Sequence, residues 1–138
     1  MASRLTEISL DCHEPQALAA FWCAVLDWVV LDAEPDLVEI GPARSEDSAL
    51  LEAVRSGPVA PTMFFAAVGE DKVVKNRMHL DVSPIDRSHD EEVARLLALG
   101  ASPADVGQTG KESWTVLADP EGNEFCVLRS LAPGHFAL

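Results

Sequence analysis

Two stretches of the chain match each other position by position, and this internal repeat limits the fold more than any other feature. Residues 8–12 read Ile-Ser-Leu-Asp-Cys and residues 78–82 read Met-His-Leu-Asp-Val. Each stretch alternates apolar with polar residues, which is typical of a half-buried strand. A helical pattern and then short β-type runs follow each, so the sequence predicts strand–helix–three strands, twice. The register of the repeat pairs Glu7 with Arg77, Ser9 with His79, and Asp11 with Asp81.

The first half of the chain gives a strand over residues 5–12 and then a helix. Pro15 opens the helix at the position where a missing N–H costs nothing. An apolar stripe then runs as far as Asp27, formed by Leu18, Phe21, Trp22, Val25 and Leu26. Further strands are expected over 28–31, 37–40 and 62–68, with a turn at 32–36. The interval 41–61 is expected to be a loop that carries one short helix within 46–55.

The second half repeats this order. A strand is expected over residues 77–82. Ser88, with Glu91 three residues later, is the signature of a helix capping box, and Gly100 is suited to the position just past that helix. Strands are expected over 101–106, 113–118 and 124–128, with a hairpin turn at 119–123. The chain is thus expected to be a single domain, with module one over about 1–70, module two over about 74–130 and a C-terminal tail over 131–138.

Composition narrows the class of partner. The chain has 10 basic and 23 acidic residues, a net charge of −13, which argues against nucleic acid and anionic membranes because both need a high density of Lys and Arg. No apolar run approaches the ~18 residues of a membrane span. The N-terminal residues lack the apolar core of a signal peptide, so the expected location is the cytoplasm.

The cysteines also indicate a cytoplasmic protein. Cys12, Cys23 and Cys126 are widely spaced and lie among apolar neighbours, and the sequence contains no Cys-x-x-Cys pair or finger-type Cys/His spacing. Reduced, mostly buried thiols are therefore expected, as in a cytoplasmic protein.

Three motifs in the two halves resemble those of the vicinal-oxygen-chelate superfamily. They are Leu-Asp-Cys-His-Glu-Pro-Gln-Ala-Leu-Ala-Ala-Phe-Trp over 10–22, Lys-Asn-Arg-Met-His-Leu-Asp over 75–81, and Asp-Pro-Glu-Gly-Asn-Glu-Phe-Cys-Val over 119–127. The superfamily includes glyoxalase I, bleomycin-resistance proteins, extradiol dioxygenases and related lyases, and the motifs are closest to its small glyoxalase-like domains. The resemblance implies an α+β fold in which two βαβββ modules form a cupped eight-stranded mixed sheet with helices outside. It also implies a ligand inside the cup and a homodimer.

The resemblance also implies where metal ligands would lie. The family's positions fall on Glu7, within 65–67, on Arg77 and on Cys126. Residues 65–67 offer no ligand, and arginine is permanently protonated and cannot bind a metal. The expectation is therefore a metal-free pocket with no cofactor. The alternative is a divalent metal held by Glu7, His79 and Cys126, since carboxylate, imidazole and thiolate all bind zinc.

Each candidate residue has a functional and a structural interpretation. Arg77 could fork onto a carboxylate or phosphate of a ligand, or form an internal salt bridge. His79 and Glu7 are the candidate acid and base residues, although His79 could instead be a structural histidine bonded to an aspartate of a neighbouring strand, and Glu7 the partner of Arg77. Trp114 could stack on a flat ligand. Asp11, Asp81 and Cys126 complete the candidate ligand-binding set, and each could equally serve the fold through turn bonding or burial.

Two functions follow. The first is a small-molecule-binding protein of the bleomycin-resistance type with a metal-free pocket. The second is a glyoxalase-like lyase or isomerase, in which Glu7 or His79 moves a proton beside a carbonyl while Arg77 or a metal stabilises the developing oxyanion. The sequence leaves open whether the protein is an enzyme.

Overall fold

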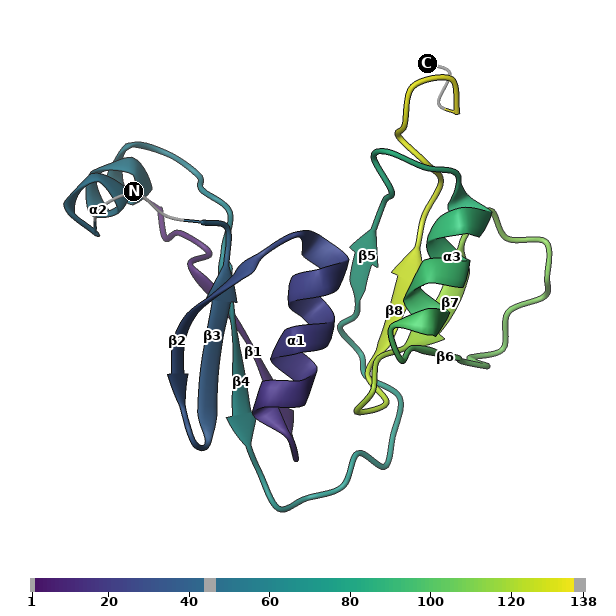
Figure 1. The fold of residues 1–138 in the computed structure, drawn as a ribbon, viewed down its shortest axis with the longest axis horizontal. Coiled ribbons are helices and arrows are strands. Elements are labelled where there is room, and N and C mark those ends of the chain that lie inside the picture. Colours follow the sequence, from purple (N-terminus) through teal and green to yellow (C-terminus); the bar gives the residue numbers. More distant parts are fainter. Residues whose placement is uncertain (1, 44–46, 136–138) are drawn as a thin grey trace. The chain divides into compact units, whose positions relative to one another are not determined.

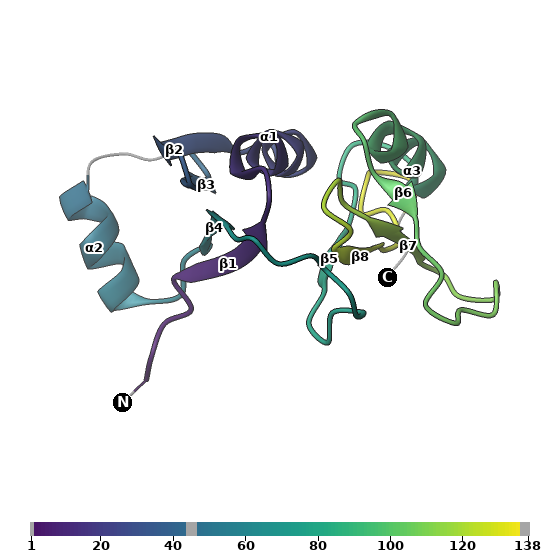
Figure 2. The same cartoon turned by 90° about the horizontal axis from the view of Figure 1, so that it is seen from below.

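The computed structural model describes residues 2–43 and 47–135, which form two compact units, Met1–Asp71 and Lys72–Leu138. Each unit contains one mixed four-stranded sheet (Figures 1 and 2). The expected α+β class is confirmed, and the strands of the described residues form two separate four-stranded sheets that are not closed into one. Across the described ranges, no helix is long and apolar enough to cross a membrane.

The first unit follows the predicted order, including the short helix before its last strand. Its elements are β1 (Glu7–Cys12), α1 (Pro15–Leu26), β2 (Val29–Glu34), β3 (Leu37–Gly41), α2 (Asp47–Ser56) and β4 (Thr62–Ala67). The sheet order is β1-β4-β3-β2, with β1 parallel to β4 and the other pairs antiparallel. Helix α2 is the short helix expected within 46–55; Glu46 lies outside the described residues.

The core of the first unit lies between α1 and the sheet. Helix α1 contacts β2, β3 and β4 (Figure 1). It contributes Leu18, which is fully buried, and Trp22, which is 1% exposed, while the sheet contributes Ile40 and Phe65. Burial of side chains of this size stabilises the folded state by about 1.5–3 kcal/mol each. The helix ends at Asp27, whose backbone is left-handed, so the predicted start and end of this helix are confirmed.

The second unit repeats the order on a smaller scale. Its elements are β5 (Leu80–Val82), α3 (His89–Ala98), β6 (Ser102–Pro103), β7 (Thr115–Ala118) and β8 (Glu124–Val127). The sheet order is β5-β8-β7-β6, with β5 parallel to β8. Helix α3 contacts β8, and Leu96 and Phe125 are both buried. The sheet and the helix therefore form a core of their own.

Two of the predicted local signals in the second unit are confirmed. The Ser88 side chain accepts from the backbone N–H of Glu91, and the Glu91 carboxylate accepts from the backbone N–H of Ser88, so the capping box is complete. In the hairpin turn, Asp119 Oδ1 accepts from the backbone N–H groups of Glu121 (2.9 Å) and Asn123 (3.0 Å). This carboxylate fixes the short connection between β7 and β8.

Several predicted boundaries are wrong. The strand expected over 77–82 begins only at Leu80, because bonds from Asn76 to β8 hold the preceding segment out of the ladder. Strand β2 extends to Glu34, so the turn expected at 32–36 is shorter. The strand expected over 101–106 is reduced to Ser102–Pro103. In the tail expected over 131–138, residues 136–138 lie outside the described residues.

Candidate functional site

The second unit contains a cavity of about 330 Å³ beside β5, β7 and β8. Its apolar wall is formed by Val116 and Phe125 from the sheet, by Leu128, which directly follows β8, and by Trp114, which immediately precedes β7 and is 45% exposed. An apolar wall beside a few polar groups is typical of a site for a small organic ligand. Trp114 thus lines the cavity, and its role as a wall for a flat ligand stays a prediction.

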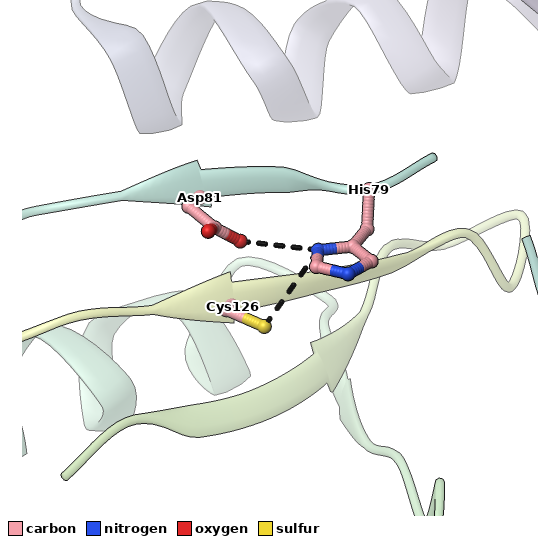
Figure 3. A group of neighbouring side chains, drawn as sticks. All are labelled: His79, Asp81 and Cys126. Atoms are coloured by element: carbon pink, nitrogen blue, oxygen red, sulfur yellow. Dashed lines mark hydrogen bonds and ion pairs between the residues drawn. The ribbon is translucent and has the colours of Figure 1, made fainter. Parts of the chain in front are cut away.

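The polar side of this second-unit cavity is formed by His79, Asp81 and Cys126 (Figure 3). In the parallel pair of β5 and β8, Asp81 is the register partner of Cys126. His79 precedes β5 by one residue and lies two residues before Asp81, which places both side chains on the same face. The three side chains thus come together through the register of two strands whose residues lie far apart in the sequence.

The distances in this His79–Asp81–Cys126 cluster are short. His79 Nδ1 lies 3.1 Å from Asp81 Oδ1 and 4.0 Å from Cys126 Sγ (Figure 3). The three possible ligand atoms all lie within 4.8 Å of one another. Since the aspartate oxygen is an acceptor, the bond to it requires a proton on Nδ1, and this leaves Nε2 as the nitrogen for another partner. His79 is thus bonded to an aspartate, but this aspartate lies two residues further along the same segment rather than on a neighbouring strand.

Burial and charge act together on the Cys126 thiol. Burial raises the pKa of Cys126, and the negative charge of Asp81 and a hydrogen bond to it raise that pKa further, while Lys75 lowers it. Cys126 is 8% exposed, so the expected burial of this thiol is confirmed. In the absence of a metal, its sulfur stays protonated at neutral pH and is a poor nucleophile.

A set of bonds to β8 fixes the segment that precedes β5. Glu124 Oε1 accepts from Lys72 Nζ at 2.7 Å, and Glu124 Oε2 accepts from the backbone N–H of Asn76 at 3.0 Å. Burial acts to raise the pKa of Glu124, but these bonds outweigh it and the net pKa is lowered. The Asn76 amide also donates to Asn123 Oδ1 at 3.0 Å. These contacts position Lys75 at the cavity and hold the chain that leads to His79.

Arg77 lies outside both β5 and the lining of this cavity. It sits in an exposed bend next to Met78, which is 81% exposed. Among the described residues, Arg77 forms no hydrogen bond or ion pair. The internal salt bridge that was the alternative for Arg77 is therefore not present with any described residue.

The two remaining candidates belong to the first unit. Glu7, on β1, lines a cavity of about 670 Å³ together with Phe64 of the sheet and Val54 of α2. Helix α2 is fastened by Arg4, whose Nε donates to the backbone oxygen of Val54 at 3.0 Å. Asp11 lies further along β1 and is exposed. Glu7 and Asp11 thus belong to one unit, and the His79–Asp81–Cys126 cluster belongs to the other.

The sequence missed part of this site. It indicated His79 and Cys126, but grouped them with Glu7 rather than with Asp81 as possible metal ligands. Imidazole nitrogen, carboxylate oxygen and thiolate sulfur are all zinc ligands, so the cluster fits a metal ion chemically. The apolar wall at Val116 and Phe125 was also missed, because the two strands, β7 and β8, are short and do not alternate apolar with polar residues.

Comparison with known proteins gives a family and a fold. A model of the glyoxalase-like domain matches residues 7–128. No curated protein matches the chain.

Solved structures of the same fold cover almost the whole chain. A glyoxalase/bleomycin resistance protein/dioxygenase family enzyme from Burkholderia phytofirmans has a TM-score of 0.60 and 17% identity, over 91% of this chain and 97% of that one. A fosfomycin resistance protein from Listeria monocytogenes, complexed with Mn(II) and dihydroxypropylphosphonic acid, has a TM-score of 0.62 and 14% identity, over 94% and 92%. A bleomycin-binding protein from Streptomyces verticillus, complexed with copper(II)-bleomycin, has a TM-score of 0.53 and 15% identity, over 94% and 99%. At these identities the likeness shows the fold alone.

Proposed function

Because the chain belongs to the glyoxalase-like domain family of the vicinal-oxygen-chelate superfamily, we propose that it binds a small organic molecule in the second-unit cavity. The observation that carries the proposal is the composition of this cavity: an apolar wall that includes the half-exposed ring of Trp114 faces the polar His79 and Asp81. Two proteins of the same fold hold small molecules in their structures, bleomycin in one and a phosphonic acid in the other. These likenesses support the proposal.

The chemistry of the cavity indicates the kind of ligand. A flat ring can stack on Trp114, which adds about 0.5–1.5 kcal/mol beyond the burial of its area. A hydrogen-bonding group on that ring can meet Nε2 of His79, because Nδ1 is occupied by Asp81. Arg77, exposed two residues before His79, is proposed to reach a carboxylate or phosphate on the same ligand. Binding of this kind needs no reaction and no metal.

A ligand screen by thermal shift tests the proposal. The probes are bleomycin and a set of small aromatic carboxylic acids and phosphonates. For a probe that raises the melting temperature of the wild type, we expect Trp114→Ala to weaken binding roughly two- to tenfold, the equivalent of the stacking energy above. His79→Ala should weaken it as well, and Arg77→Ala should weaken only the binding of anionic probes.

Matched controls lie elsewhere in the chain. His89→Ala changes a histidine of the second unit that does not line the cavity, and Arg55→Ala changes an exposed arginine of the first unit. Both variants should keep wild-type shifts. Equal shifts in the wild type and in Trp114→Ala and His79→Ala would place the ligand outside this cavity, and equal shifts in Arg77→Ala would remove Arg77 from the site.

The second candidate function is a lyase or isomerase of the glyoxalase type. The observation that favours it is the 3.1 Å bond from His79 to Asp81, because a histidine held by a carboxylate can accept a proton at its other nitrogen. Glu7, on the first unit, is the other proposed base. Turnover of α-keto aldehyde hemithioacetals that is lost in His79→Gln and reduced in Asp81→Asn would support this function. Ligand binding without any turnover would support the binding protein instead.

We further propose that the protein is a cytoplasmic homodimer. All three cysteines are free, which suits a reducing compartment. The homodimer is proposed because the family resemblance implies it. Light scattering on the purified full chain would give the mass of two chains if this is correct, and of one chain if it is wrong.

A further inference from the structure

We propose that His79, Asp81 and Cys126 form a binding site for a thiolate-accepting divalent metal ion, Zn²⁺ or Co²⁺, that lies wholly within the second unit. This goes beyond the small-molecule binding proposed above and does not depend on it. It also differs from the metal positions implied by the family resemblance. Of the three residues, only Cys126 falls on such a position; His79 lies two residues past the position of Arg77, and Asp81 four residues past it.

The first argument is the convergence of the three donor atoms. Tetrahedral zinc with ordinary bond lengths holds nitrogen and oxygen about 3.3 Å apart, and holds sulfur about 3.6 Å from either. Here Nδ1 of His79 lies 3.1 Å from the Asp81 oxygen and 4.0 Å from the Cys126 sulfur. The imidazole nitrogen that would bind the metal already faces both other donors, so the ring needs no flip (Figure 3). The third pair, the Asp81 oxygen and the Cys126 sulfur, lies within 4.8 Å, so rotation of these two side chains by up to about 1 Å would bring all three donors to the tetrahedral distances.

The second argument is the rigidity of the support. Asp81 and Cys126 are register partners in the parallel pair of β5 and β8, so the sheet fixes the separation of their backbones. The chain before His79 is fastened to β8 by Asn76, which donates to both Glu124 and Asn123. A metal site held on strands loses little conformational entropy when the ion binds.

The third argument is an open coordination position. Three protein ligands leave the fourth tetrahedral position of zinc for water or a ligand. The side chains of His79 and Asp81 are 38% and 46% exposed, and both line the second-unit cavity, so a molecule in that cavity could reach the ion. The arrangement is that of a ligand-accepting zinc site rather than a closed structural one.

The protons and charges balance without another reactant. The thiol of Cys126 gives up its proton to solvent when sulfur binds the metal. His79 loses the proton on Nδ1 and takes one up on Nε2, so the imidazole stays neutral. One proton is released for each ion bound. The dication then meets one thiolate and one carboxylate, which brings the charge of the three side chains and the ion to zero.

The donor set also selects the metal. Thiolate and imidazole favour zinc and cobalt, whereas manganese and magnesium prefer sites built from oxygen ligands. We therefore expect zinc to displace manganese from this protein, although the Listeria monocytogenes protein of the same fold was crystallised with Mn(II).

Cobalt spectroscopy on the purified full chain tests the proposal. After removal of metal by a chelator, titration with Co²⁺ should give a sulfur-to-cobalt charge-transfer band that saturates at one ion per chain, and Zn²⁺ should abolish it. Cys126→Ser should lose the band. His79→Ala and Asp81→Asn should weaken cobalt affinity at least about tenfold, since even indirect supporting contacts at metal sites are worth that much.

The controls are variants of another cysteine and of another histidine. Cys23→Ser and His89→Ala should keep both the band and the affinity. Absence of a band in the wild type, persistence of the band in Cys126→Ser, or tighter binding of Mn²⁺ than of Zn²⁺ would overturn the proposal.

A measurement on the wild type alone covers the case in which the Cys126 variant fails to fold. X-ray absorption of the zinc-loaded protein should show one sulfur at about 2.3 Å together with nitrogen and oxygen at about 2.0–2.2 Å. A zinc shell without sulfur would overturn the proposal. Because no organic ligand is added, failure of either experiment leaves the proposed small-molecule binding standing.

Discussion

Among single side chains, Trp22 is the largest that is fully buried in the core of the first unit. It is 1% exposed, and its ring meets that of Phe21 edge-on with centroids 5.4 Å apart. We expect Trp22→Ala to lower the free energy of unfolding by about 3–5 kcal/mol, because the cavity left behind collapses only in part. Urea denaturation measures this loss.

Trp114→Ala is the matched comparison, because that ring is 45% exposed. It should change the free energy of unfolding far less than Trp22→Ala does. A similar loss in both variants would contradict the assignment of Trp22 to the core and of Trp114 to a ligand-accessible wall.

Burial of single residues was predictable where the local pattern determines it. Trp22 sits on an apolar stripe with helical spacing, and Cys126 lies among apolar neighbours, so both were expected to be buried. Asp81 was different. Its approach to Cys126 depends on the register of two strands that are separated by a helix and a hairpin, and no local pattern specifies that register.

At the scale of elements, the capping box of α3 has a measurable pH dependence. The backbone N–H and hydroxyl of Ser88 bond to the Glu91 carboxylate and lower its pKa below the ordinary value of 4.5. A group whose pKa is lowered by folding stabilises the folded state above its unfolded pKa, and this contribution is lost as the pH falls through the folded value.

We therefore expect Glu91→Gln to lower the melting temperature at pH 7, and we expect this difference to shrink at pH values below 4.5 as the wild type loses its charge. Thermal unfolding at both pH values measures the effect. The control Glu70→Gln removes an exposed carboxylate from the segment between the units, and it should give the same small difference at both pH values. A Glu91→Gln difference independent of pH would contradict the role of the charged cap.

The bounds of a helix or strand were predictable where the sequence itself contains residues that are typical of its start or end. Pro15 and the capping box of Ser88 gave the starts of α1 and α3. Strand β5 shows the opposite case. The alternation of apolar and polar residues continues back to Arg77, but bonds from Asn76 to Glu124 and Asn123 compete with ladder pairing, so the strand begins at Leu80.

At the scale of the whole molecule, the chain divides into two compact units at Asp71 and Lys72. The segment that follows the division is exposed, with Val73 at 88% and Val74 at 75%. Exposed segments without helix or strand are the preferred sites of proteolysis. We expect trypsin to cut first at Arg77, which lies in an exposed bend past the bonded Asn76, and this cut yields two fragments of roughly half the chain each.

Mass spectrometry of a brief digest identifies the first cut. Lys111 offers a comparison, because it lies on an exposed loop that Glu112 closes through bonds to the backbone N–H and hydroxyl of Thr109. These bonds lower the pKa of Glu112 to about 2. A first cut at Lys111 would contradict the expected order. Replacement of both Lys75 and Arg77 by Gln should slow the first cut.

The confinement of the His79–Asp81–Cys126 cluster to one repeat also shapes how such a chain can change under selection. All the groups that would hold the metal lie between residues 79 and 126, so drift in the first repeat leaves them untouched. An insertion or deletion that shifts β8 against β5 by one residue would turn Cys126 to the opposite face and bring Phe125 or Val127 beside Asp81 instead. The site is thus tolerant of divergence in one half of the gene and intolerant of a single-residue slip in the other.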